Sequence, residues 1–204
     1  AGAGKSTVAR GVAAALGFTY LDSGAMYRSV ALAALRDGTD LDDPEAMGEL
    51  ARSLTIGVSD GRVELDGDDV TDAIRSAEVT AAASRAAVHP EVRAAMVERQ
   101  RALIKAGRYV AEGRDIGTEV SPEAPLKVFL TASGEERARR RAAQTGEPRD
   151  EVLSSQRRRD SRDRGREHGA LRAAEDAVEL DTTEMPLEAV VERVVELARG
   201  RGIS

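Results

Sequence analysis

The chain of 204 residues contains no cysteine and only two histidines, His89 and His168. The absence of cysteine excludes a disulfide framework and thiolate metal sites, and two imidazoles are too few for the usual histidine-rich cage. Any catalytic metal is therefore expected to be a hard ion that binds through oxygen, as Mg²⁺ does.

Aromatic residues and long apolar runs are also scarce. Five Phe and Tyr side chains and no Trp leave little surface on which single-stranded bases could stack. No apolar run approaches the ~18 residues of a membrane span, and no leader of the secretory kind opens the chain. We therefore expect a cytoplasmic, monomeric protein that acts on small molecules, with neither a membrane nor a nucleic acid as partner.

Charge is distributed unevenly along a chain whose net charge is −6. The segment 137–166 holds 11 arginines and 5 acidic residues, whereas the segment 37–72 holds 12 acidic residues and 2 arginines. Clustered arginine in an acidic protein favours a local anion-binding surface over general binding to nucleic acid.

The apolar pattern alternates between helical and strand periods, which is typical of an α/β fold with a parallel sheet covered on both faces. Between Leu54 and Leu65 the residues alternate around the turn dipeptide Asp60-Gly61, which predicts a β-hairpin and a small lobe near 54–72. Helical spacing predicts helices at 6–16, 25–36, 44–53, 72–88, 90–104, 133–145, 149–166 and 186–199. Short apolar runs predict strands at 18–21, 109–111, 127–130 and 178–180.

The opening residues resemble the end of a phosphate-binding loop: Ala1, Gly2, Ala3, Gly4, Lys5, Ser6 and Thr7. Glycines let backbone N–H groups turn toward an anion, Lys5 can reach the β- and γ-phosphates of ATP, and the Ser6 hydroxyl can bind Mg²⁺ at a helix N-terminus. The first glycine of the full pattern lies outside this chain, and a flexible Gly/Ala/Ser terminus is the alternative. Kinases, GTPases and motor ATPases share such loops, but no Asn-Lys-x-Asp motif is present, and the Arg-dense segment favours a small-molecule kinase with a lid.

Four further stretches resemble the cytidylate kinase family of the bacterial type. They are Asp22–Arg28 (DSGAMYR), Ala83-Ser84 with Val92-Arg93, Glu112–Thr118 (EGRDIGT) and Arg159–Arg166 (RDSRDRGR). The resemblance implies a single P-loop nucleoside monophosphate kinase domain over 1–204, with a parallel sheet flanked by helices. Its core would be 1–36, 100–135 and 170–204, its monophosphate-binding part with an inserted β-containing lobe 37–99, and its helical Arg-rich lid 136–169.

The resemblance also implies roles for residues that bind the acceptor. Ser23, Arg28 and Arg114 would bind its phosphate, and Ser84, Arg93 and Asp115 would recognise cytosine. On pattern alone, a solvated helix face is the alternative for Arg28, and Ser84 is an ordinary residue of an alanine-rich helix.

In the Arg-rich stretch, Arg159, Asp163 and Arg166 share one helix face, which without the resemblance could be a salt-bridged surface. By resemblance, Arg159 and Asp163 bind the sugar hydroxyls of the acceptor, and Arg166 binds the transferring phosphates. Arg137 is a candidate for stacking on adenine. Glu112 could hold a Mg²⁺-bound water or pair with a neighbouring arginine.

The expected reaction is phosphoryl transfer from ATP to CMP or dCMP, a step of pyrimidine nucleotide metabolism, with Mg²⁺ as cofactor. The expected catalytic residues are Lys5, Arg114, Arg159 and Arg166. Two other functions remain open on the residues: a P-loop kinase for UMP, AMP or shikimate, and a non-catalytic module that binds nucleotide or RNA. A monophosphate acceptor has a second pKa near ~6 and needs no general base, which fits a chain with few histidines.

Overall fold

The computed structural model describes residues 4–59, 61–164 and 171–204, without the side chains of residues 144 and 158–164. Contacts divide the chain into two compact units. The terminal unit comprises Ala1–Phe18 and Arg114–Ser204, and the middle unit comprises Thr19–Gly113. Among the described residues, no helix is both long and apolar enough to cross a membrane.

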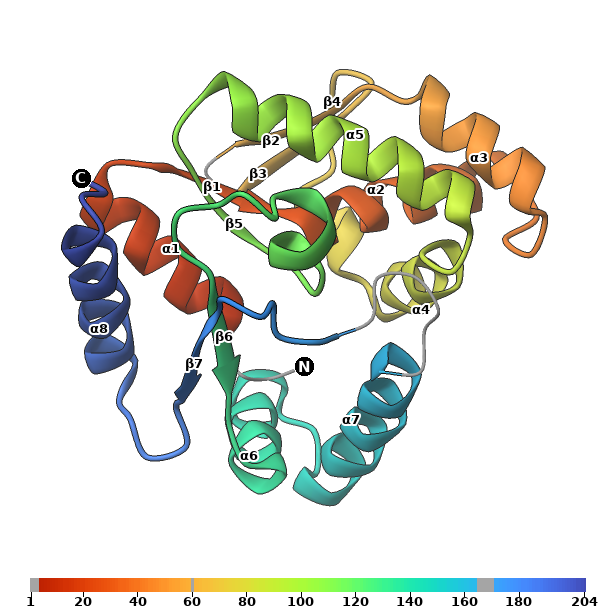
Figure 1. Ribbon diagram of the computed structural model, residues 1–204. Helices are drawn as coiled ribbons and strands as arrows, with labels where there is room; N and C mark the ends of the chain where they lie inside the picture. Colours follow the sequence, from red (N-terminus) through yellow and green to blue (C-terminus); the bar gives the residue numbers. More distant parts are fainter. Residues whose placement is uncertain (1–3, 60, 165–170) are drawn as a thin grey trace. The chain divides into compact units, whose positions relative to one another are not determined.

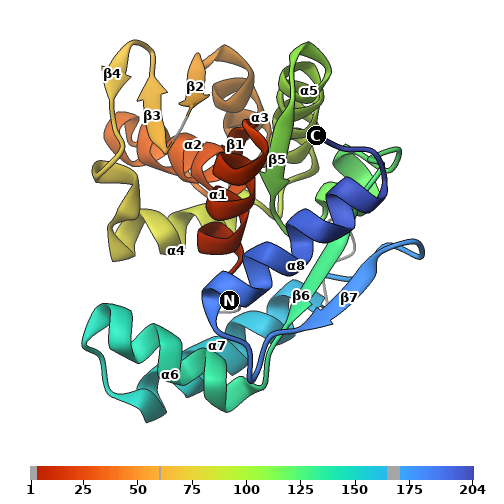
Figure 2. The same cartoon turned by 90° about the vertical axis from the view of Figure 1, so that its left-hand side faces the viewer.

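The middle unit begins and ends with strands that pair with each other. Its elements are β1 (Thr19–Asp22), α2 (Ser23–Asp37), α3 (Pro44–Ser53), β2 (Ile56–Ser59), β3 (Arg62–Leu65), β4 (Asp68–Asp69), the 3₁₀ turn η1 (Ala73–Arg75), α4 (Ala77–Ala86), α5 (Pro90–Ala106) and β5 (Tyr109–Glu112). In the views of Figures 1 and 2, β2, β3 and β4 form a small sheet of their own, and β2 packs on α2.

The terminal unit contains the first helix and everything after Gly113. Its elements are α1 (Lys5–Leu16), the π-helical turn η2 (Ile116–Val120), β6 (Val128–Thr131), α6 (Gly134–Thr145), α7 (Arg149–Arg164), β7 (Val178–Asp181) and α8 (Leu187–Gly200). Helix α1 packs on α8, and α6 packs on α7. β6 and β7 lie side by side in both views, and α6 follows the end of β6 (Figure 1).

The predicted parallel strands are confirmed. β1 pairs in parallel with β5, with Leu21 opposite Ala111, and β6 pairs in parallel with β7, with Leu130 opposite Leu180. The predicted hairpin is also confirmed, because β2 and β3 are antiparallel and Val58 lies opposite Val63. The fold is therefore the α/β type that the sequence predicts, with one parallel pair in each unit.

Local signals set most helix ends. Gly17 and Gly38 end α1 and α2 in the left-handed conformation, with φ of 66° and 70°, which glycine adopts without a steric penalty. Proline begins α3 and α5, because at the first helical position its missing N–H has no helical partner to lose.

The structure differs from the sequence prediction at three places. The helix predicted over 72–88 is a 3₁₀ turn followed by α4, because the Ser76 hydroxyl accepts a hydrogen bond from the Val79 N–H and caps a new helix. The two-residue strand β4 and the π-helical turn η2 were not predicted. β4 depends on strand pairing and η2 on backbone hydrogen bonds, and no strong residue pattern marks either of them.

Candidate functional site

The phosphate-loop residues that the structure describes lie at the amino end of α1. Gly4 precedes the helix with φ of 77°, a left-handed conformation that favours glycine. Lys5 and Ser6 are the first two helical residues and are half-buried, and Thr7 is exposed. Backbone N–H groups and the helix dipole favour an anion at such an end. Ala1, Gly2 and Ala3, which the sequence assigns to the same loop, lie outside the described residues.

The junction of β1 and α2 positions two candidate acceptor ligands. Asp22 caps α2: its Oδ1 accepts a hydrogen bond from the Ala25 N–H at 2.9 Å, and its Oδ2 pairs with Nη2 of Arg28 at 2.9 Å. Ser23 is buried, and its hydroxyl donates to the Glu112 carbonyl oxygen at 2.7 Å. A Cβ on Gly24 would lie 3.0 Å from Arg28 Nη1 and 3.1 Å from Asp22 Oδ1, so a glycine lets this pair approach closely.

Glu112 lies at the carboxyl end of β5, directly opposite Asp22 in the parallel register. Its Oε1 accepts a hydrogen bond from the Tyr20 hydroxyl at 2.8 Å, so the carboxylate is held by its neighbouring strand. The structure thus brings Glu112 and Ser23 together, at the strand edge where ligands of open parallel sheets collect.

The donor types at Ser6 and Glu112 fit Mg²⁺. A hydroxyl and a carboxylate are both hard oxygen ligands, and Mg²⁺ is usually held by one or two protein groups together with water and substrate phosphates. Among the described residues, no three His, Cys, Asp or Glu side chains gather in a cluster that could hold a metal.

Arg114 and Asp115 lie between β5 and η2, in the terminal unit. The Asp115 carbonyl oxygen accepts hydrogen bonds from the N–H groups of Thr118, Glu119 and Val120, at 3.2, 2.8 and 3.3 Å. Asp115 is only 7% exposed, whereas Arg114 is half-buried. Single π-helical turns are frequent at functional sites, and this one fixes the backbone of a candidate base reader.

The other two candidate base readers lie on neighbouring helices of the middle unit. Arg93 is on the first turn of α5 and only 6% exposed, and Ser84 is half-buried on α4, where its hydroxyl donates to the Thr80 carbonyl oxygen at 3.2 Å. His89 precedes the proline that begins α5, as expected, and its Nε2 bonds the Leu41 carbonyl oxygen at 2.8 Å.

The Arg-rich segment is described in part. Arg137 lies on the first turn of α6, and its Nε donates to the Ala132 carbonyl oxygen at 3.2 Å. Arg159 and Asp163 belong to α7, but their side chains are outside the description, and Arg166 lies outside the described residues altogether.

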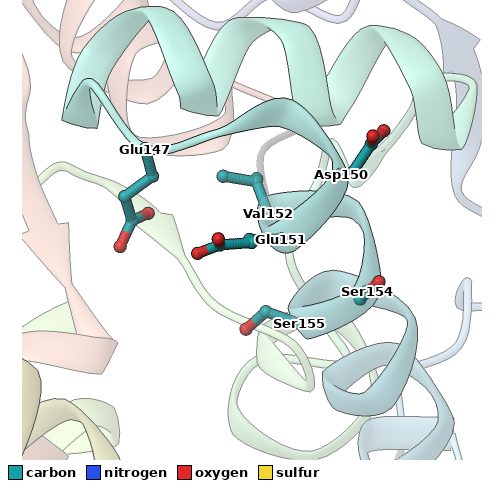
Figure 3. Close-up of a pocket in the computed structure, with 6 residues that line it drawn as sticks. All are labelled: Glu147, Asp150, Glu151, Val152, Ser154 and Ser155. Carbon is teal, nitrogen blue, oxygen red and sulfur yellow. The ribbon is translucent and has the colours of Figure 1, made fainter.

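A cavity of about 500 Å³ opens where α6 turns into α7. Its lining holds none of the candidate residues and is acidic: Glu147, Asp150, Glu151, Val152, Ser154 and Ser155 (Figure 3). Carboxylates repel phosphate, so this cavity is unsuited to a nucleotide phosphate.

Sequence reasoning missed two residues that support the site. Asp22 stands in the family-like stretch 22–28, but its position six residues before Arg28 does not reveal that it both caps α2 and pairs with that arginine. The sequence indicates only that Tyr20 is part of a strand, whereas in the structure its hydroxyl donates to Glu112. The helix-capping preference of aspartate was the available signal for the first.

A glycine at positive φ that leads into a helix, parallel strands flanked by helices, and charged residues at the carboxyl end of a strand agree with a P-loop kinase fold. The family model described as Cytidylate kinase matches residues 1–200. The cytidylate kinase of Pseudomonas aeruginosa strain LESB58 is 48% identical over 212 residues, covering 98% of this chain and 93% of the relative. That of Geobacillus kaustophilus is 49% identical over 210 residues, covering 98% and 94%. The chain belongs to the cytidylate kinase family.

Proposed function

We propose that this chain transfers the γ-phosphoryl group of ATP to CMP or dCMP, producing ADP and CDP or dCDP. The observation that carries the proposal is the family match over residues 1–200, because this range includes every residue to which a role is assigned below. The position of Lys5 and Ser6 at the amino end of α1 supports an ATP phosphate site there.

We assign the binding of the acceptor phosphate to Ser23, Arg28 and Arg114. Ser23 and Arg28 lie within the first two turns of α2, so the helix dipole adds to the positive charge of Arg28. The ion pair with Asp22 already orients Arg28, so this long side chain loses less rotamer freedom when it binds the phosphate.

The cytosine base is assigned to Ser84, Arg93 and Asp115. Asp115 can accept from the 4-amino group, and Arg93 can donate to O2 and N3, which together distinguish cytosine from uracil. Both charged side chains are at least nine-tenths buried, and buried polar groups reject analogues that leave them unpaired.

The chemistry rests on charge neutralisation and alignment. The acceptor phosphate is mostly dianionic at neutral pH, so it attacks without a protein base. Lys5, Arg114, Arg159 and Arg166 would neutralise the developing charge, while Asp163 and Arg159 hold the sugar and Arg137 holds adenine. Ser6 and, through water, Glu112 would hold Mg²⁺, which when bound screens and orients the ATP phosphates.

The test is ADP release measured with CMP, dCMP, UMP, AMP and shikimate as acceptors. We expect turnover with CMP or dCMP to exceed that with the others by at least about tenfold, because one mismatched buried polar contact has that effect or a larger one. Binding of nucleotide without phosphoryl transfer to any acceptor would contradict the proposal, as would a preference for UMP, AMP or shikimate.

Arg114→Ala tests the role of a single residue. It should lower turnover by at least about tenfold, because it removes a charge-assisted contact to the transferred group. Arg166→Ala should do the same. The matched control is Arg62→Ala, because Arg62 is an exposed arginine of the small β-sheet lobe that pairs with Asp69 at 3.1 Å and should leave turnover unchanged.

A further inference from the structure

Arg140 joins α6 to the loop that follows β7. Its Nε donates to Glu136 Oε1 at 2.8 Å, its Nη1 to the Thr182 hydroxyl at 3.1 Å and its Nη2 to the Thr182 carbonyl oxygen at 2.5 Å. Glu136 is one turn earlier on α6, whereas Thr182 is 42 residues later in the chain. One planar guanidinium therefore fixes two elements at once, a geometry that its rigid fork of donors suits.

The loop after β7 is in turn bonded to the end of β6. The Thr182 hydroxyl donates to the Thr131 carbonyl oxygen at 3.0 Å, and the Thr182 N–H donates to the same oxygen at 2.9 Å. The Ser133 N–H donates to the Thr183 hydroxyl at 2.9 Å. Thr182 is only 1% exposed, and its carbonyl oxygen also accepts a hydrogen bond from the Met185 N–H at 3.2 Å, so losing Arg140 would remove one of two donors to that oxygen and the donor to the hydroxyl oxygen.

The same helix end is attached to α7. The Gln156 side-chain amide donates to the Arg137 carbonyl oxygen at 3.2 Å, and Gln156 is 6% exposed. Arg137 itself is held through its Nε by Ala132. The first turn of α6 is thus connected to the loop after β6, to the loop after β7 and to the second helix of the Arg-rich segment.

This network lies at the carboxyl ends of two parallel strands, where open sheets bind their ligands. The amino end of α1, with its phosphate-loop residues, belongs to the same unit and lies on the same side as the carboxyl end of β6 in both views (Figures 1 and 2). The affinity for a donor nucleotide bound by Lys5 and Arg137 would therefore depend on how rigidly this network holds this end of the unit.

We propose that Arg140 is a positioning residue for the donor nucleotide: by clamping Thr182 to α6 it sets the place of Arg137 and of the loop after β7, and so determines ATP affinity and not acceptor affinity. This inference rests on the proposed function, since it assigns the donor to this end of the terminal unit.

Arg139 provides a matched control on the same helix. It bonds the same carboxylate, with Nε to Glu136 Oε2 and Nη2 to Oε1, both at 2.7 Å. Its side chain is 64% exposed, and among the described residues Glu136 is its one hydrogen-bond partner. Arg139→Met and Arg140→Met thus remove the same charge from the same carboxylate, but the second alone releases Thr182.

The experiment measures KM for ATP, KM for CMP and kcat, together with ADP binding by calorimetry, in wild type and both variants. Arg140→Met should raise KM for ATP and weaken ADP binding by about fivefold or more, because it breaks two hydrogen bonds to a buried residue. KM for CMP should stay within about twofold. Arg139→Met should stay within about twofold throughout.

Two conservative variants complete the test and remain available if Arg140→Met does not fold. Arg140→Lys keeps the charge but cannot form the forked contacts, so it should restore only part of the donor affinity. Thr182→Val keeps the carbonyl contact with Arg140 but loses both hydroxyl contacts, the one from Arg140 and the one to the Thr131 carbonyl oxygen, so its effect on donor affinity should be larger than that of Arg139→Met.

Equal donor affinities in Arg140→Met and Arg139→Met, or donor affinities unchanged in both Arg140→Lys and Thr182→Val, would overturn the proposal. So would an equal rise in both Michaelis constants, which is what general loosening of the structure would cause. If the wild type binds ADP but phosphorylates no nucleoside monophosphate, the proposed function fails, while the comparison of ADP affinities still decides the role of Arg140.

Discussion

The interactions that stabilise the middle unit differ from those that stabilise the Arg-rich helix pair α6–α7. The large hydrophobic cluster lies entirely within the middle unit and includes fully buried Leu21, Met26, Met47 and Met96. In α6 and α7, by contrast, the described side chains include few buried apolar ones, chiefly Ala138 and Val152, and polar contacts such as those of Arg140 replace them. Apolar packing fixes one shape, whereas segments that bury little apolar surface open at lower cost in free energy. The assignment of 136–169 as a lid, still a prediction from the sequence, agrees with that difference.

Truncating a core side chain should therefore have its largest effect in the middle unit. Met47 on α3 is 0% exposed, and Met47→Ala should lower the free energy of unfolding by about 2–5 kcal/mol, because it removes buried surface and leaves a cavity. Urea denaturation at neutral pH measures this. The control is Leu153→Ala on the half-buried face of α7, which should lower it by about 1 kcal/mol or less. Equal losses would contradict the contrast between the two regions.

Adding one methyl group tests how tightly α3 and α5 pack. A Cβ on Gly48 would lie 2.5 Å from the Glu91 Cβ, which is close to the backbone of α5 and cannot swing away. Gly48→Ala should therefore destabilise the protein by about 1–3 kcal/mol, despite the higher helix propensity of alanine. Gly134→Ala at the start of α6 is the matched control, because its Cβ would meet other side chains only at 3.8 Å. A stabilising Gly48→Ala would show that the helices separate easily.

Asp22 links stability of the middle unit to the acceptor side of the candidate site. Asp22→Ala removes the N-cap of α2 and should lower the free energy of unfolding by about 0.5–2 kcal/mol. It should also raise KM for CMP, because Arg28 loses the carboxylate that orients it. Asp22→Asn keeps a good cap, so it should preserve stability while still altering KM for CMP. If Asn destabilises as much as Ala, the ion pair and not the cap stabilises α2. KM for ATP should respond less than it does in Arg140→Met.

The sequence predicted the fold well where a single residue determines a local conformation. Glycine ends α1 and α2, proline begins α3 and α5, and Gly61, with φ of 86°, lies between the two strands of the hairpin. The break at Ser76 was missed because the residues on both sides are helix-compatible, and only the capping bond separates η1 from α4. The π-helical turn was missed because it depends on backbone bonds to the Asp115 carbonyl oxygen.

The candidate site was predictable where its residues form contiguous motifs. Lys5, Ser23 and Arg114 stand in short stretches whose residue types suit phosphate binding, and they lie at a helix start or next to the end of a strand in the structure. Contacts between distant segments carry no such signal. The bond from Arg140 to Thr182 spans 42 residues, and Arg140 is one of several similar arginines in its helix, so sequence reasoning gave it no individual role.

The smallest predicted effect is a change in how stability depends on pH, and it concerns the polar side of the comparison. Hydrogen bonds from Arg139 and Arg140 lower the pKa of Glu136 from an ordinary 4.5 to about 2. A carboxyl group whose pKa is lower in the folded state stabilises fully above its unfolded pKa, and this contribution is lost as the pH falls toward 2. The difference in stability between wild type and Glu136→Gln should therefore be constant from pH 7 to about pH 5 and shrink between about pH 4.5 and 2. Urea midpoints across this range measure it.

Glu135→Gln is the control, because Glu135 is exposed and meets Arg149 only at 3.5 Å, so its difference from wild type should be small at every pH. If the difference in stability between wild type and Glu136→Gln stays constant down to pH 2, the Glu136 side chain stabilises the protein through its packing and not through its charge. Packing would then contribute more to the stability of α6, as it does in the middle unit, than the charged composition of this helix indicates.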